Sequence, residues 1–138
     1  MREASIRWLE NLFADAEIIG ADILAVQPGW PQGPRITYRL LDQGDRTQVG
    51  AFFASVGADI DLIIEVGSHI PQHRATCLAK GLGGLRSGGL YVLEDIAISH
   101  PGHPTFAAHS RRDAKQLPTA LHVLLALQHL RDTNMPLT

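Results

Sequence analysis

The sequence predicts an α/β fold with a mostly parallel sheet of about four strands, flanked by helices. Four short apolar segments with strand character alternate with segments of helical periodicity, and the connections between them are short. Strands that are joined through helices run parallel and are linked by right-handed crossovers. Because 138 residues are enough for one domain, we expect a single α/β domain over residues 1–138.

The predicted helices place apolar residues at helical spacing and carry capping residues at their ends. Asp45 or Thr47 can cap the start of the second helix, and Gly57 suits its C-terminal cap. Ser68 is the candidate cap of the third helix, which Pro71 opens. The last helix is apolar nearly all round, which is typical of a helix that is deeply buried or shared with a partner. The expected ranges are 4–14, 45–57, 71–80 and 119–131.

The predicted strands end in polar or acidic residues. They cover about residues 16–23, 35–41, 60–66 and 88–96, and a loop rich in Pro and Gly joins the first two. In an open parallel sheet, ligands bind beyond the carboxyl ends of the strands. The sequence therefore predicts a binding site at that edge, with the following candidates: Asp22, Asp42, Gln43, Glu65 to His69, Glu94 and Asp95.

Composition excludes several classes of protein. Twelve Lys and Arg residues against fourteen Asp and Glu residues give a formal charge of −2, which argues against a nucleic-acid binder or a binder of anionic membranes. The single cysteine, Cys77, cannot form an internal disulfide or a cysteine-rich zinc site, and its helical position predicts a small core residue. The apolar stretch 119–130 is shorter than the roughly 20 residues of a membrane span, and the N-terminus lacks a signal-peptide core. We therefore expect a cytoplasmic protein.

Three residues near the ends of the first two strands suit a nucleotide. An acidic residue at the position of Asp22 can accept two hydrogen bonds from the vicinal hydroxyls of a ribose, although an exposed turn aspartate would look the same. The side chains of Asp42 and Gln43 can read an adenine edge or cap the next helix.

The ends of the last two strands carry residues suited to acid–base and metal chemistry. His69 follows a tight turn at Gly67, and the ordinary pKa of histidine suits a general base; the alternative is a histidine that makes an ordinary hydrogen bond at a helix start. The adjacent carboxylates of Glu94 and Asp95 are hard oxygen ligands that suit Mg²⁺ or Ca²⁺. Their alternative is one carboxylate that caps the next loop and one in solvent.

The order of four segments resembles that of class I S-adenosylmethionine-dependent methyltransferases, which have a Rossmann-like fold. The segments are AEIIGADI, RITYRLLDQGD, IDLIIEVGSHIPQH and LRSGGLYVLEDI. They are most similar to the sugar O-methyltransferases of the macrocin and mycinamicin type, over about residues 5–96. The most specific parts are the GSH turn and the Glu-Asp pair after GGLYV. The resemblance implies an O-methyltransferase-like protein that acts on a hydroxylated small molecule such as a sugar.

The resemblance also implies S-adenosylmethionine as the cofactor. Asp22 matches the acidic residue that holds the cofactor ribose, and Asp42 and Gln43 match the segment near the adenine. His69 matches the general base that takes the proton from the sugar hydroxyl. The methyl group would pass in line from sulfur to oxygen, so positioning is a large part of the implied catalysis.

The implied metal is Mg²⁺, with one departure from the family pattern. Glu94 and Asp95 match two of the carboxylates that hold a metal, which positions and acidifies the hydroxyl. The family turn reads Asp-Asp-Gly-Ser-His, whereas this chain reads Glu-Val-Gly-Ser-His from Glu65. Val66 therefore stands where the family has a metal-binding aspartate, and Glu65 is expected to point to the opposite side of the strand.

A second departure concerns the start of the sequence. The family places a strand and a glycine-rich cofactor loop ahead of the helix that begins here near Ala4, so we expect both to be missing. That strand is central in the family sheet, and its loss exposes unpaired edges on both neighbouring strands. Two hypotheses follow: a truncated O-methyltransferase that is incomplete or inactive, or a non-catalytic module for dimerisation or partner binding. With such edges, we expect a homo-oligomer.

Overall fold

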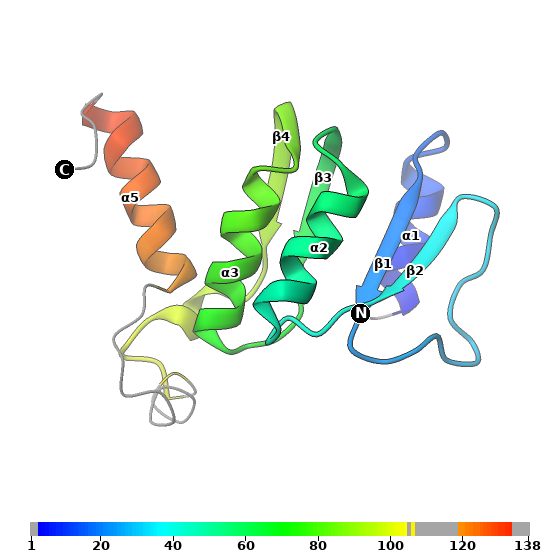
Figure 1. Ribbon diagram of the computed structural model, residues 1–138, viewed down its shortest axis with the longest axis horizontal. Helices are drawn as coiled ribbons and strands as arrows, with labels where there is room; N and C mark the ends of the chain where they lie inside the picture. Colours follow the sequence, from blue (N-terminus) through cyan, green and yellow to red (C-terminus); the bar gives the residue numbers. More distant parts are fainter. Residues whose placement is uncertain (1–2, 105, 107–118, 134–138) are drawn as a thin grey trace.

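A computed structural model of the protein describes residues 3–104, 106 and 119–133 (Figure 1). Strands and helices alternate along the chain except between β1 and β2, which a loop joins, and this order confirms the predicted α/β class. The boundaries differ from the predicted ones by a few residues, most at the fourth strand, which begins at Leu85. The elements are α1 (Glu3–Leu12), β1 (Ile18–Asp22), β2 (Ile36–Leu40), α2 (Arg46–Val56), β3 (Ile60–Glu65), α3 (Pro71–Leu82), β4 (Leu85–Leu93), the short 3-10 helix η1 (Ile96–Ser99) and α5 (Ala120–Thr133).

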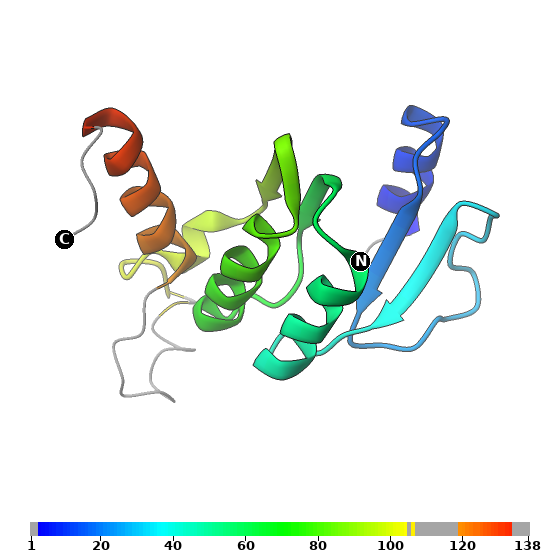
Figure 2. The same ribbon diagram turned by 45° about the horizontal axis from the view of Figure 1, so that its top comes forward.

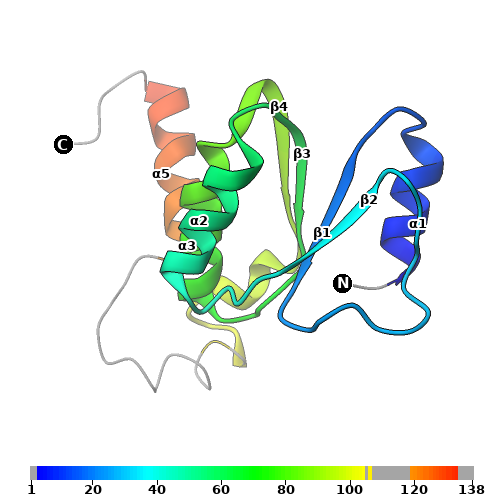
Figure 3. The same ribbon diagram turned by 45° about the vertical axis from the view of Figure 1, so that its right-hand side comes forward.

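In the part of the chain that the structure describes, four strands form two separate two-stranded sheets. β1 pairs with β2 and β3 pairs with β4, both in parallel as predicted. The views in Figures 1, 2 and 3 agree that β1 and β3 are neighbours, which gives the spatial order β4, β3, β1, β2. Within the described residues no ladder joins β1 to β3. The strands that the sequence predicts for one sheet are thus divided, and the division falls between two edges that a central strand would join.

Helices cover both faces of the strands. α2 and α3 lie on one side and α1 lies on the other (Figure 3). The buried cluster on the α2 and α3 side consists of Leu41, Val49 and Cys77, and Ala21 of β1 packs against it. Cys77 is 4% exposed, which confirms its predicted place in the core. Through this cluster α2 connects β1 with α3.

The predicted caps of α2 are confirmed, and the predicted cap of α3 is wrong. Asp45 accepts hydrogen bonds from two backbone N–H groups of the first turn, and Gly57 ends the helix with φ of 91°, in the region that favours glycine. α3 begins after Ile70, which has no side-chain cap. Ser68 lies two residues too early to cap this helix, and its Oγ instead accepts from the N–H of Ile70 at 3.2 Å and lies 3.0 Å from Nδ1 of His73.

The last helix, α5, is less buried than its composition predicts. It packs against α3 and η1, and Ala120 is its one buried residue. Leu125 and Leu127 are 53% and 41% exposed. Of the two alternatives for this helix, deep burial is not observed, and contact with a partner remains a prediction. Among the helices that the structure describes, none has the length and apolar character needed to cross a membrane.

Two helical glycines allow a matched test of this packing. A Cβ at Gly81 would lie 2.6 Å from the Tyr91 ring and 3.1 Å from Phe53, whereas at Gly50 the nearest atom is 4.0 Å away, on Lys80. We expect Gly81→Ala to lower the free energy of unfolding by about 1–3 kcal/mol through overpacking. We expect Gly50→Ala to raise it by roughly 0.5–1 kcal/mol through helix propensity. Urea unfolding of both variants checks this, and shifts of the same sign would contradict it.

Candidate functional site

The predicted site residues follow the carboxyl ends of the strands. Asp22 ends β1, and Asp42 and Gln43 follow β2. The remaining candidates follow the second sheet: His69 lies after β3, and Glu94 and Asp95 lie after β4. The strand ends lie on one side of the molecule, the lower side in Figure 1. The two sheets thus deliver their polar ends to a common side, although they are not joined.

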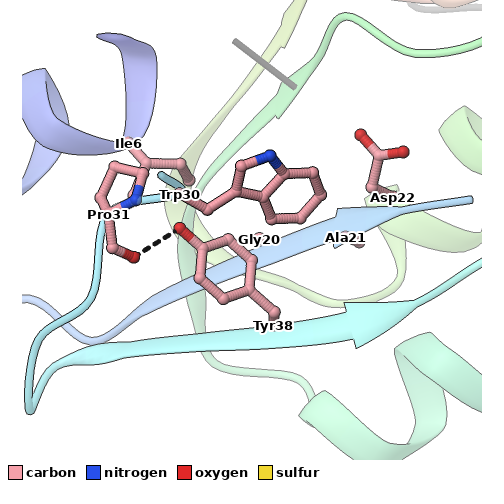
Figure 4. A pocket seen from close by; sticks show the side chains of 7 residues that line it. All are labelled: Ile6, Gly20, Ala21, Asp22, Trp30, Pro31 and Tyr38. Atoms are coloured by element: carbon pink, nitrogen blue, oxygen red, sulfur yellow. Dashed lines mark hydrogen bonds between the residues drawn. The ribbon is translucent and has the colours of Figure 1, made fainter. Parts of the chain in front are cut away.

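Asp22 lines a small cavity between β1, β2 and the loop that joins these two strands (Figure 4). Trp30 and Tyr38 stack at a tilt with ring centroids 5.1 Å apart, and the Tyr38 hydroxyl donates to the carbonyl of Pro31 at 2.7 Å. The cavity has a volume of about 10 Å³, which is room for one water. A ribose does not fit inside it, so a nucleoside would meet Asp22 from the open side. The lining residues are Ile6, Gly20, Ala21, Asp22, Trp30, Pro31 and Tyr38.

The Asp22 side chain is a carboxylate at neutral pH. Its Oδ1 accepts a hydrogen bond from the N–H of Leu24 at 3.0 Å. Partial burial works against ionisation, but hydrogen bonds to the carboxylate outweigh it and hold the pKa of Asp22 below its usual value. An ionised carboxylate is the state that accepts hydrogen bonds from vicinal hydroxyls.

Asp42 and Gln43 lie side by side in the sequence but make different contacts. Oδ1 of Asp42 accepts from the N–H of Gly44 at 2.7 Å, as in an ordinary turn. The Gln43 side chain points inward: its Nε2 lies 3.3 Å from Oε1 of Glu65, and its Oε1 accepts from the N–H of Ser68. Both ends of the Gln43 amide are therefore used inside the protein. The sequence did not indicate this internal role, and the approach of these residues to an adenine remains a prediction.

A buried ion pair connects the ends of β3 and β4. Glu65 and Arg74 are 6% and 1% exposed, and Nε of Arg74 lies 3.9 Å from Oε1 of Glu65. The Tyr91 hydroxyl donates to Oε2 of Glu65 at 2.5 Å. Arg74 also donates to the carbonyl of Asp95 at 2.9 Å and to that of Glu94. This network fixes the backbone that carries the two predicted metal ligands.

Arg74 was missed by sequence reasoning, although a signal for it exists. It lies at helical spacing from three other buried residues of α3, namely Cys77, Leu78 and Gly81. A charged residue on the buried face of a helix requires a buried partner. Glu65, at the end of an apolar strand, is the matching acid.

The predicted metal ligands do not form a complete site. Glu94, Asp95 and His69 are exposed, and Asp95 has φ of 53°, in the left-handed region. Within residues 3–104, 106 and 119–133, no three His, Cys, Asp or Glu side chains come together to hold a metal ion. Val66 offers no ligand atom, and Glu65 is engaged in the interior. The donor set therefore does not fit a protein-held Mg²⁺ by itself, and no reaction step is assigned to a metal.

Sequence comparison finds O-methyltransferases of Streptomyces and Micromonospora species. The 8-demethyl-8-alpha-L-rhamnosyl tetracenomycin-C 2'-O-methyltransferase of Streptomyces olivaceus is 31% identical over 96 residues, which is 70% of this chain and 25% of that enzyme. Demethylmacrocin O-methyltransferase of Streptomyces fradiae is 30% identical over 126 residues, 91% of this chain and 31% of that enzyme. Mycinamicin VI 2''-O-methyltransferase of Micromonospora griseorubida is 29% identical over 126 residues. No protein-family model matches the chain.

Structural comparison points to the same group of proteins. The MycE methyltransferase from the mycinamycin biosynthetic pathway, solved with Mg and SAH, superposes with a TM-score of 0.71 and 26% sequence identity. The match covers 97% of this chain and 33% of MycE. A second MycE structure, also matched with a TM-score of 0.71, contains mycinamycin VI as well.

The fold, with its polar side chains at the strand ends, defines the Rossmann-like α/β unit of class I methyltransferases. Within that class, the chain is similar to the macrocin- and mycinamicin-type sugar O-methyltransferases, which confirms the resemblance seen in the sequence. It spans 25–31% of the length of the curated relatives described above.

The buried Glu65 makes the stability of the fold depend on pH. Burial raises the pKa of Glu65 above its ordinary 4.5, against the opposing effects of the Tyr91 hydroxyl, Arg74 and Gln43. The folded protein therefore binds this proton more tightly than the unfolded chain does. Stability from this group is full below pH 4.5 and falls as the pH rises through the folded pKa.

We expect Glu65→Gln to remove this component. The difference in unfolding free energy between wild type and variant should then change most as the pH rises from about 4.5. Urea unfolding at pH values from 4 to about 7 measures it. A difference that stays constant across that range would contradict a raised pKa for Glu65.

Proposed function

We propose that the chain is an S-adenosylmethionine-dependent O-methyltransferase-like protein that acts on a hydroxylated small molecule such as a sugar. The observation that carries this proposal is the ionised Asp22 at the end of β1, where it lines a small cavity. Support comes from relatives whose names state O-methyl transfer and from MycE structures that contain SAH.

The proposal gives each predicted residue a role in binding or proton transfer. The carboxylate of Asp22 would accept hydrogen bonds from the ribose hydroxyls of the cofactor, and Asp42 and Gln43 would lie near its adenine. The exposed His69, after β3, would accept the proton of the acceptor hydroxyl. The cofactor supplies a methyl group bound to a positively charged sulfur. The chain's own residues would orient it and the acceptor.

A cofactor titration tests the role of Asp22. We expect S-adenosylmethionine to bind the full chain in isothermal titration, and Asp22→Asn to weaken binding about tenfold because a charged acceptor is lost. Asp59→Asn is the matched control, since Asp59 lies just before the first residue of β3, at the opposite end of the strand from the predicted site. An absence of binding heat at millimolar cofactor would overturn the proposal.

The proposal also includes Mg²⁺. The carboxylates of Glu94 and Asp95 would bind the ion, and water molecules would supply its remaining ligands. We expect weak binding of Mn²⁺, detected by electron paramagnetic resonance, that the double variant Glu94→Gln and Asp95→Asn abolishes. The control is Asp61→Asn, on an exposed residue of β3 that pairs with Arg86. Equal Mn²⁺ binding by wild type and the double variant would rule out this site.

The second candidate function is a non-catalytic module for dimerisation or partner binding. The observation that favours it is the division of the strands into two sheets, together with the exposed apolar residues of α5. A homo-oligomer in sedimentation velocity, combined with no cofactor binding, supports this candidate. A monomer at all concentrations contradicts homo-oligomerisation.

A further inference from the structure

Arg74 is a buried cation between the ends of two neighbouring strands. Its Nη1 donates to the carbonyl of Asp95 at 2.9 Å and its Nη2 donates to that of Glu94, while its Nε lies 3.9 Å from Oε1 of Glu65. Within the part of the chain that the structure describes, Nε has no hydrogen-bond partner, so the two carbonyls and the charge of Glu65 hold the side chain. One guanidinium thus gathers oxygen atoms from the end of β3 and from the chain that follows β4.

The two carbonyls face one guanidinium because the chain turns between them. In an extended strand, successive carbonyls point to opposite sides. Asp95 has φ of 53° and ψ of 36°, in the left-handed region, and among the described residues no other non-glycine residue has a positive φ. Its carbonyl also accepts from the N–H of Ile98 in η1 at 3.1 Å. A left-handed aspartate persists only where its surroundings hold it, and the buried guanidinium supplies two of the contacts that do so.

The other side chains at these strand ends offer little to a metal ion. Val66 has no ligand atom, and the Glu65 carboxylate is buried and engaged by hydrogen bonds. The exposed carboxylates of Glu94 and Asp95 remain, and the backbone that carries them is already bonded to Arg74. The order of this edge therefore comes from a cation that belongs to the chain itself.

We propose that Arg74 is a positioning residue: its guanidinium holds the left-handed turn at Asp95, and thereby the two carboxylates that follow β4, without the help of a metal ion. Lysine does not replace it, because a single ammonium group lacks the planar fork of donors that reaches two carbonyls at once. The turn keeps its form whether or not Mg²⁺ or a cofactor binds nearby, so a failure of the proposed function leaves this role of Arg74 intact.

Amide exchange at Ile98 reports the turn, because this N–H donates to the carbonyl of Asp95. The buried Val49 of α2 reports global opening. In NMR on the full chain, we expect Arg74→Lys to speed exchange at Ile98 about tenfold more than at Val49, because one of the two carbonyl contacts is lost. The matched control variant is Arg86→Lys, at an exposed ion pair on β4, and it should leave both rates unchanged.

Added ions test the need for a guanidinium and the independence from metal. In the wild type, EDTA and then excess Mg²⁺ should leave the exchange rate at Ile98 within about twofold of its starting value. In Arg74→Ala, guanidinium at about 50 mM, far below denaturing concentrations, should restore slow exchange at Ile98. Methylammonium at the same concentration, which has the charge without the fork, should not.

Three results would overturn the role of Arg74. The first is an exchange rate at Ile98 in Arg74→Lys that rises no more than the rate at Val49. The second is a wild-type turn that opens in EDTA and closes again with Mg²⁺, because a metal ion would then hold it. The third is an equal response of Arg74→Ala to guanidinium and methylammonium, including no response to either.

Discussion

The arrangement of the strand ends depends on the contacts of one buried side chain, the carboxylate of Glu65. Through Arg74 it is connected to the backbone after β4, and through Gln43 to the chain that follows β2. A buried charge is tolerated only when it is paired and hydrogen-bonded, so these groups must assemble together. The two sheets, which share no ladder in the described residues, are thus connected at their carboxyl ends by side chains of one polar network.

The individual helices and strands could be predicted from local chemistry, but the pairing of the strands could not. The capping roles of Asp45 and Gly57 follow from rules that consider only neighbouring residues in the chain. The predicted capping role of Ser68 is wrong because its hydroxyl accepts a hydrogen bond from the N–H of Ile70, ahead of the first turn of α3. The sequence does not specify this partner. The parallel direction of β3 and β4 followed from their connection through α3, whereas β1 and β2 pair in parallel across a loop without a helix. Their division into two sheets was signalled only by the family resemblance, because strand pairing joins residues far apart in the chain.

For the candidate site, position was predictable and side-chain direction was not. Asp22 was identified because it ends a strand, and the structure places it there with its charge retained. Gln43 is equally close to a strand end, yet it points inward, because Glu65 and the Ser68 amide offer it buried partners. His69, Glu94 and Asp95 keep their predicted places after the strands, and their chemical roles stay predictions.

The solitary thiol of Cys77 follows from this packing and has a use of its own. Burial, and then the nearby Glu65, raises the pKa of Cys77 to about 11, so the sulfur stays protonated at neutral pH. A protonated, enclosed thiol reacts with alkylating reagents only when the protein opens around it. Because the sequence contains one cysteine, all labelling occurs at Cys77. The labelling rate therefore reports how often α3 leaves the cluster with Leu41 and Val49.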